Sequence, residues 1–370
     1  MADYDLAFEG GGAKGLVFIG ALQELERRGH RGRRFVGTSA GALVAALLAA
    51  GHDAAGLERA MAERLPDGTA RLATFLDAPS GFSDADVRQS ALYQLLARID
   101  VPLIPDAVEA RLDRALVDGM LAAAPFRMLF SLLEKGGPYA GDRLRAWLAE
   151  QLDVRQPGLG AASFAELADR TGRDLTITVS DTSGEEMLVL NSRTAPDCPV
   201  VWAVRASMSI PFVFQEVVWQ PAWGAYRGRD LSGHVLIDGG VLSNFPIRLL
   251  ASGLEEIQEV MGDAGEEVPN LGLLIDERLA VEGGSGGEAH RGAIDGLFEL
   301  KPLRRLERIM ETVLNAHDRA VIDASLALGE VCRLPARGYS ALDFGMSDAR
   351  RQALIAGGRR AMAAHFDRAA

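Results

Sequence analysis

The sequence has few cysteines and no surplus of positive charge, and each absence excludes a class of protein. Among 370 residues only Cys198 and Cys332 are cysteines, far apart and without metal-ligand spacing, which suits a reducing compartment. The formal net charge is −12, so nothing resembles the basic footprint of a nucleic-acid-binding protein. The same charge would repel an anionic membrane unless the basic residues gather on one face.

Long apolar runs of the kind that cross a membrane or direct export are also lacking. The first residues, MADYDLAFEGGG, do not follow the charged-then-apolar pattern of a signal peptide. Residues 36–52 carry no formal charge, but the run is shorter than the ~20 apolar residues that span a bilayer. We therefore expect a soluble, cytoplasmic protein, although export by a signal-independent route would leave the same sequence.

The N-terminal part has a regular alternation of strand and helix patterns. Residues Tyr4–Glu9 and Arg33–Val36 read as short strands. Each is followed by a helix pattern, over about Lys14–Arg28 and over Ser39–Ala50, and a glycine follows each helix. This order predicts a βαβ unit with a parallel, buried sheet.

The remainder divides into a helical middle and a mixed C-terminal part. From about 72 to 152 the pattern is helical, with an amphipathic stretch at Asp106–Leu121 followed by FRMLFSLL, and we expect a helical cap there. The cap segments would either form a lid or membrane-facing surface, or pack as core over the sheet, which we favour. Further strands are expected at 174–180, 187–191 (as a hairpin), 213–218, 235–237 and 271–275, a glycine-rich loop at 283–292, and helices at 303–328 and 347–367.

The glycine-rich stretch GGGAKG, Gly10–Gly15, follows the first strand and precedes the first helix. Its letters fit a dinucleotide-binding loop, but the acidic residue expected about twenty residues further on is replaced by RGRRFVGTSAG. Such a loop also aims backbone N–H groups at developing negative charge, helped by the N-terminus of the following helix. We favour this oxyanion role.

The stretch GTSAG, Gly37–Gly41, follows the second strand and precedes the second helix. A Gly-x-Ser-x-Gly turn at this place pushes a serine hydroxyl outward, as a nucleophile requires. Ser39 would then be the nucleophile and the Ala40 N–H a further oxyanion donor. The alternative is that Ser39 caps the helix. Two anion-ready turns at the ends of adjacent parallel strands favour the nucleophile.

A base for Ser39 is not found among the downstream histidines, since His290 lies in the glycine-rich loop and His317 and His365 on expected surface helices. The stretch LIDGGVLSNFPI instead ends an apolar strand in Asp238, before two glycines. This aspartate would form a turn, or, if buried within reach of Ser39, accept its proton directly.

GGGAKG, GTSAG and DGG in this order resemble the patatin-like phospholipase family. VRASMSIPFVFQEVVW at 204–219 and FAEL at 164–167 add to the resemblance, which covers roughly residues 3–250. It implies an α/β protein with a three-layer α/β/α patatin-like fold, a mostly parallel central sheet and an inserted helical cap. The expected domain then spans 1–250, including the cap at about 72–152, and 251–370 add a strand and a mainly helical extension.

The resemblance also implies the roles of the motif residues. Ser39 is the nucleophile and Asp238 the general base of a serine–aspartate dyad, and Gly10, Gly11 and Gly12 form the oxyanion hole with Ala40. The sequence reads DGG where many members have DGA. Supporting motif positions are Lys14, Gly15, Gly37, Gly41, Gly239 and Gly240.

The expected activity is that of a phospholipase A or lysophospholipase working through an acyl-enzyme, without cofactor or metal. The expected partners are a phospholipid or lysophospholipid, transient membrane contact and no nucleic acid, while an activating protein partner and the oligomeric state stay open. A transacylase, a non-lipid esterase and a non-catalytic membrane- or partner-binding scaffold are alternatives. The basic stretch KPLRRLER, 301–308, would touch anionic headgroups or form a solvated helix face, which we favour.

Overall fold

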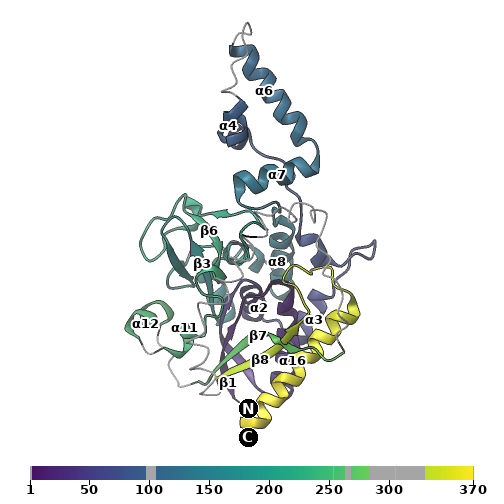
Figure 1. Cartoon of the computed structure of the whole chain (residues 1–370). Helices are drawn as coiled ribbons and strands as arrows, with labels where there is room; N and C mark the ends of the chain where they lie inside the picture. Colours follow the sequence, from purple (N-terminus) through teal and green to yellow (C-terminus); the bar gives the residue numbers. More distant parts are fainter. Residues whose placement is uncertain are drawn as a thin grey trace.

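The structure is a computed structural model of the chain, and it describes residues 2–96, 106–252, 254–262, 268–283, 305 and 330–369 (Figure 1). Its centre is an eight-stranded sheet in the order β5-β6-β3-β2-β1-β7-β8, with β4 paired to β3. The strands β1, β2, β3, β7 and β8 pair in parallel, and β4, β5 and β6 pair antiparallel. Their bounds are β1 Asp3–Phe8, β2 Arg31–Thr38, β3 Asp174–Asp181, β4 Glu186–Leu190, β5 Val217–Val218, β6 Val235–Asp238, β7 Asn270–Ala280 and β8 Val331–Arg337.

Helices cover both faces of the sheet, as the alternation of side chains along its strands requires. Leu6 and Phe8 of β1 pack into the main core, whereas Ala7 between them belongs to a separate cluster on the other face. The main core is covered by α1 (Val17–Arg27), α2 (Ala40–Ala49), α3 (Ala54–Met61), α8 (Asp142–Arg155), α10 (Val200–Ser207) and α16 (Asp348–Ala369). The opposite layer is thinner and contains α11 (Arg248–Ala251) and α12 (Glu255–Met261). The expected three-layer α/β/α fold is confirmed.

The middle of the chain forms a helical arm, which we define as α4 (Asp84–Gln89), α5 (Ala91–Leu96), α6 (Asp106–Leu121) and α7 (Ala124–Lys135). The arm stands away from the sheet (Figure 1). Three of its buried side chains, Val87, Val117 and Phe130, form a cluster of their own, whereas Met128 of α7 belongs to the main core. The favoured prediction that these segments pack as core over the sheet is therefore wrong for Asp106–Leu121, whereas FRMLFSLL reaches the main core through Met128. By contrast α8, within the expected cap, packs into the main core through Leu144, Trp147, Leu148 and Leu152.

Two strand predictions need correction. The strand expected at 213–218 is reduced to β5, because the N–H of Gln215 donates to Tyr139 and that of Glu216 to Lys135 instead of to the sheet. The C-terminal part contains a second strand, β8, that the sequence analysis missed. Its Arg333 and Pro335 interrupt the apolar pattern, and proline is tolerated there because β8 lies at the edge of the sheet.

Three other expectations lie outside the described residues. They are the helix at 303–328, the loop at 283–292 and the basic stretch at 301–308, of which only Gly283 and Arg305 are described. The helix expected at 347–367 is α16 (Figure 1), and it packs against α1.

Candidate active site

Ser39 occupies the turn between β2 and α2 in a backbone conformation that suits a nucleophile, with φ 52° and ψ −121°. The glycines on either side are needed for close approach. A Cβ at Gly37 would lie 2.3 Å from the carbonyl oxygen of Gly41, and a Cβ at Gly41 would lie 2.4 Å from that of Phe8. The Ser39 side chain makes no capping hydrogen bond to α2. The alternative that the Ser39 side chain caps α2 is therefore wrong.

Ser39 and Asp238 are brought together by the edges of β3. Thr38 of β2 pairs with Thr178, and Asp238 of β6 pairs with the next residue, Val179. β4 pairs with Thr178 and Val179 along one edge of β3. β2 and β6 therefore both lie along the opposite edge of β3, where the end of β2 meets the end of β6. The Ser39 hydroxyl donates a hydrogen bond to Oδ2 of Asp238 at 2.7 Å.

Asp238 is a buried carboxylate, with 4% of its surface exposed. Burial disfavours its charged form and raises the pKa of Asp238 to about 7, against the opposing effect of hydrogen bonds from Ser39 and Gly240. The N–H of Gly240 donates to Oδ1 of Asp238 at 2.8 Å. Asp238 therefore also stabilises the turn that follows β6, which is the alternative role that the sequence suggests. A Cβ at Gly239 would lie 2.3 Å from the carbonyl oxygen of Thr178, which accounts for glycine there.

Ser207, at the end of α10, supports the Ser39 turn, and sequence reasoning missed this role. Its hydroxyl accepts a hydrogen bond from the Ser39 N–H at 2.8 Å and donates one to the Thr178 carbonyl at 2.7 Å. The Ser209 carbonyl, two residues on, accepts the N–H of Asp238 at 3.0 Å. The RASMS segment belongs to the stretch that carries the family resemblance, and that is the one sequence signal that could have drawn attention to Ser207.

The glycine-rich loop lies directly beside Ser39, since a Cβ at Gly10 would be 3.2 Å from that of Ser39. The N–H of Gly10 donates to the Asn244 carbonyl at 2.9 Å, so this N–H is engaged in the structure, whereas the oxyanion role expected of it needs a free donor. Asn244 belongs to the stretch LIDGGVLSNFPI, but no role is predicted for it from the sequence. Its side-chain amide donates to Glu9 at 3.1 Å, and both contacts hold the loop against the segment after β6.

The backbone N–H groups of Gly11, Gly12 and Ala40 have no hydrogen-bond partner within the ranges described above. Gly12 has φ 54°, a conformation that favours glycine, and opens the short 3-10 helix Gly12–Leu16. Ala40 is the first residue of α2, whose N-terminus carries a partial positive charge. A Cβ at Gly15 would lie 2.9 Å from that of Ala40, so the two turns pack closely. These three N–H groups can receive an oxyanion beside Ser39.

Lys14 is the basic residue of the glycine-rich loop, and it forms an ion pair with Glu277 of β7. Within the described part of the chain it makes no hydrogen bond or ion pair with Ser39 or Asp238, and its pair with Glu277 ties the loop to β7. Of the histidines considered as bases, His290 and His317 lie outside the described residues, and His365 stacks edge-on against Phe366 on α16. Within the described ranges no three His, Cys, Asp or Glu side chains gather as a metal site would need.

A narrow pocket with a cavity volume of about 30 Å³ adjoins the two turns. Its thirteen lining residues are glycines or have apolar side chains, so no side chain in it would bind a charged group. Gly12, Gly15 and Ala40 line it on the side of the turns, and Met208 lies between the two serines that hold the backbone of Ser39 and Asp238.

Comparison with known protein families agrees with the resemblance seen in the sequence motifs. A family model described as patatin-like phospholipase matches residues 6–251. The chain belongs to the patatin-like phospholipase family. Membership supports a lipid hydrolase at the level of the family.

Individual relatives span different lengths. The protein YqhO of Bacillus subtilis (strain 168), described as uncharacterized, is 27% identical over 96% of this chain and 95% of its own. Triacylglycerol lipase 4 of Saccharomyces cerevisiae is 28% identical over 66% of this chain, which is 22% of the yeast protein. VipD from Legionella pneumophila has 16% identity and a TM-score of 0.45, with 99% of this chain and 67% of VipD covered. The type III effector ExoU has 16% identity and a TM-score of 0.42, with 53% of its chain covered.

One bent pair of helices in the patatin-like domain has the length and composition of a membrane span. It joins Arg114–Leu121 to Ala124–Lys135 at an angle of 112°. No single helix among the described residues is long and apolar enough to cross a membrane.

Proposed function

We propose that the protein hydrolyses acyl esters of phospholipids or lysophospholipids by a Ser39–Asp238 dyad. The observation that carries this proposal is the buried 2.7 Å hydrogen bond from the Ser39 hydroxyl to Asp238, beside three backbone N–H groups that have no partner among the described residues. A carboxylate that shares a hydrogen bond with the hydroxyl can take its proton directly, so no histidine is needed.

In the first half of the reaction, Ser39 Oγ attacks the ester carbonyl carbon and its proton passes to Asp238 Oδ2. The carbonyl oxygen becomes an oxyanion, which the N–H groups of Gly11, Gly12 and Ala40 stabilise. Losing one such donor typically costs about 10²–10³ in rate. The C–O bond then breaks, and Asp238 gives the proton to the leaving alcohol, which leaves an acyl-enzyme.

In the second half, water attacks the acyl-enzyme while Asp238 takes a proton from it. The same N–H groups hold the second oxyanion. When the bond from carbon to Ser39 Oγ breaks, Asp238 returns the proton to the serine, and a free fatty acid leaves. A transacylase would use an alcohol in place of water at this step, and the products distinguish the two.

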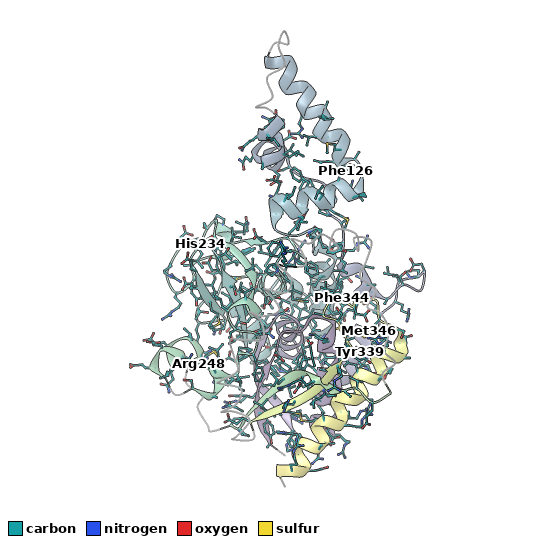
Figure 2. The ribbon with its side chains drawn as sticks, viewed as in Figure 1. Phe126, His234, Arg248, Tyr339, Phe344 and Met346 are labelled. Atoms are coloured by element: carbon teal, nitrogen blue, oxygen red, sulfur yellow. The ribbon has the colours of Figure 1, made fainter. Side chains whose placement is uncertain are left out.

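The helical arm supports transient contact with lipid. Leu116 is 53%, Phe126 46% and Leu133 68% exposed, and Phe126 is labelled on the arm in Figure 2. The charged side chains around them are paired within the arm, Lys135 with Asp86 and Arg114 with Asp118. With a net charge of −12, contact through apolar side chains is favoured over attraction to anionic headgroups.

The test is fatty-acid release from mixed phospholipid vesicles, compared between wild type and Ser39→Ala. We expect release by the wild type alone, and the products identify the ester bond that is cut. Ser39-dependent cleavage of soluble esters without release from vesicles would keep the chemistry and point to a missing activating protein partner. Equal release by both proteins would contradict the dyad, and a folded wild type inactive on every ester would favour the non-catalytic scaffold.

A further inference from the structure

The apolar pocket lies beside the two turns of the candidate active site, and the proposed reaction steps assign no role to its apolar side chains. At one end, Gly12 and Ala40 line it, and both carry N–H groups that face the proposed oxyanion. The acyl carbonyl of a substrate would sit there, and its chain would extend into the pocket. This inference therefore rests on the proposed function. An apolar, buried space of this kind accepts hydrocarbon and disfavours water or polar groups.

Other lining residues of the pocket come from outside the motif turns. Met61 closes α3, and Leu72 and Phe75 lie on the short 3-10 helix Arg71–Phe75. Phe344 joins them, with its ring 6.1 Å from that of Phe75 between centroids. Behind Phe75 stands Trp147 of α8, at 5.2 Å between centroids, so Phe75 has a firm support.

Phe344 comes from a segment far along the chain, Gly338–Met346, which connects β8 to α16 and which we call the C-terminal strap. Tyr339, Phe344 and Met346 of the strap are labelled in Figure 2. The strap is tied to α16, because the Tyr339 hydroxyl donates to the Arg350 carbonyl at 3.0 Å and the Arg350 side chain donates to the Gly338 carbonyl at 2.9 Å.

The strap also holds the glycine-rich loop. The Ala341 carbonyl accepts the N–H of Ala13 at 2.7 Å, and a Cβ at Gly12 would lie 2.2 Å from the same oxygen. One segment therefore contacts the loop that carries the proposed oxyanion donors, through Ala341, and lines the pocket, through Phe344. It lies wholly outside the residues that match the family model, 6–251.

We propose that the C-terminal strap closes an acyl-chain pocket and that Phe344, packed on Phe75, sets the longest acyl chain that the enzyme accepts. Phe344 is then a specificity-determining residue supplied by a part of the chain that the family motifs do not reach. Each methylene moved from water into such a pocket adds about fourfold to binding. The gain stops at the chain length at which the terminal methyl meets the two rings.

The experiment measures kcat/KM on soluble nitrophenyl esters from butanoate to dodecanoate, for wild type, Phe344→Ala and Phe344→Trp. For the wild type we expect kcat/KM to rise with chain length and then break. Phe344→Ala moves the break to longer chains and Phe344→Trp moves it to shorter ones. The opposite directions at one position separate a change of pocket depth from a general loosening.

The matched control is Phe164→Ala on α9 (Phe164–Thr171), which deletes an equally buried ring that does not line the pocket. It is expected to lower stability and keep the wild-type break. Should Phe344→Ala fail to unfold cooperatively, Phe75→Leu removes less volume from the same wall and is expected to shift the break the same way.

The outcomes separate this inference from the proposed function. If the wild type cleaves butanoate in a Ser39-dependent way but the break is the same in all Phe344 and Phe75 variants, the strap does not set chain length and the inference is overturned. If no ester is cleaved through Ser39, the proposed function itself fails, and the inference fails with it.

Discussion

Asp238 is the residue whose environment most directly controls the proposed chemistry. Its pKa of about 7 makes it a far stronger base than an exposed aspartate, but only its ionised form can accept the proton of Ser39. We therefore expect kcat/KM for a soluble ester to rise with pH and to level off above about pH 7. The measurement is a pH profile of kcat/KM under conditions where the fold is intact. A flat profile across this range would contradict Asp238 as the base.

The same burial makes Asp238 costly for folding. Its folded-state pKa lies above its ordinary value of 3.8, so between the two values the folded protein keeps a proton that the unfolded chain has released. Stability from this group therefore falls as pH rises from about 4 to about 7, and the full cost remains above that.

Asp238→Asn should remove this cost while abolishing turnover. We expect the variant to be more stable than wild type by a few kcal/mol at about pH 8, and the difference to disappear toward about pH 4. Urea denaturation at both pH values measures it. A variant that is less stable than wild type at the higher pH would show that the carboxylate is better solvated than its burial implies.

Ser207 gives a test of positioning rather than chemistry. Ser207→Ala leaves the Ser39 N–H without its partner, in a turn whose φ is 52°. We expect kcat to fall by about 10–100-fold with little change in KM, because the loss of a buried partner is worth about 1–3 kcal/mol. Ser131→Ala, which removes an equally buried hydroxyl bonded to Gly137 near the arm, is the control and should leave kcat unaltered.

The site residues divide according to how local their signals are. The meeting of Ser39 and Asp238 could be predicted because each stands at the end of an apolar strand with glycines within two residues of it, a pattern visible in neighbouring letters. Ser207 and Asn244 could not, because their roles depend on hydrogen bonds to residues 168 and 234 positions away. The hydrogen bond from the Gly10 N–H to the Asn244 carbonyl could not be predicted for the same reason.

Among the elements, those with a strong periodic pattern could be predicted and those defined by their neighbours could not. The βαβ unit over β1 to α2 has alternating or 3.6-residue patterns bounded by glycines. β8 lacks such a pattern and is a strand because β7 lies beside it. The arm helices were predicted as helices, but sequence periodicity does not say against what a helix packs.

The arm provides a prediction at this scale. The double variant Phe126→Ser and Leu133→Ser should weaken flotation with neutral and acidic vesicles alike, because the proposed contact is apolar. Hydrolysis of soluble esters should be unchanged, since the cluster around Phe130 is not touched. Leu254→Ser, which alters a 50% exposed leucine on the opposite layer of the sheet, is the control. Equal flotation of all three proteins would exclude the arm as the lipid contact.

At the scale of the whole molecule, the described residues after 251, which lie beyond the family match, pack directly against the region that contains the motifs. β7 and β8 extend the sheet, and α16 packs along α1, the helix that follows the glycine-rich loop. The two helices approach backbone to backbone. A Cβ at Gly20 of α1 would lie 1.7 Å from the Ile355 carbonyl oxygen, and one at Gly358 of α16 would lie 2.1 Å from that of Val17.

This contact predicts that the C-terminal helix unfolds together with the motif region. Gly358→Ala should destabilise the protein by about 1–3 kcal/mol, because the added methyl forces the helices apart and this outweighs the gain in helix propensity. Gly119→Ala, at an exposed position of α6 with nothing nearby, is the matched control and should be neutral or stabilising by up to about 1 kcal/mol. Urea transitions followed by tryptophan fluorescence and by circular dichroism should coincide in both variants. If Gly358→Ala behaves like Gly119→Ala, α16 does not press on α1, and the C-terminal strap would lose the anchor that holds Phe344 against the pocket.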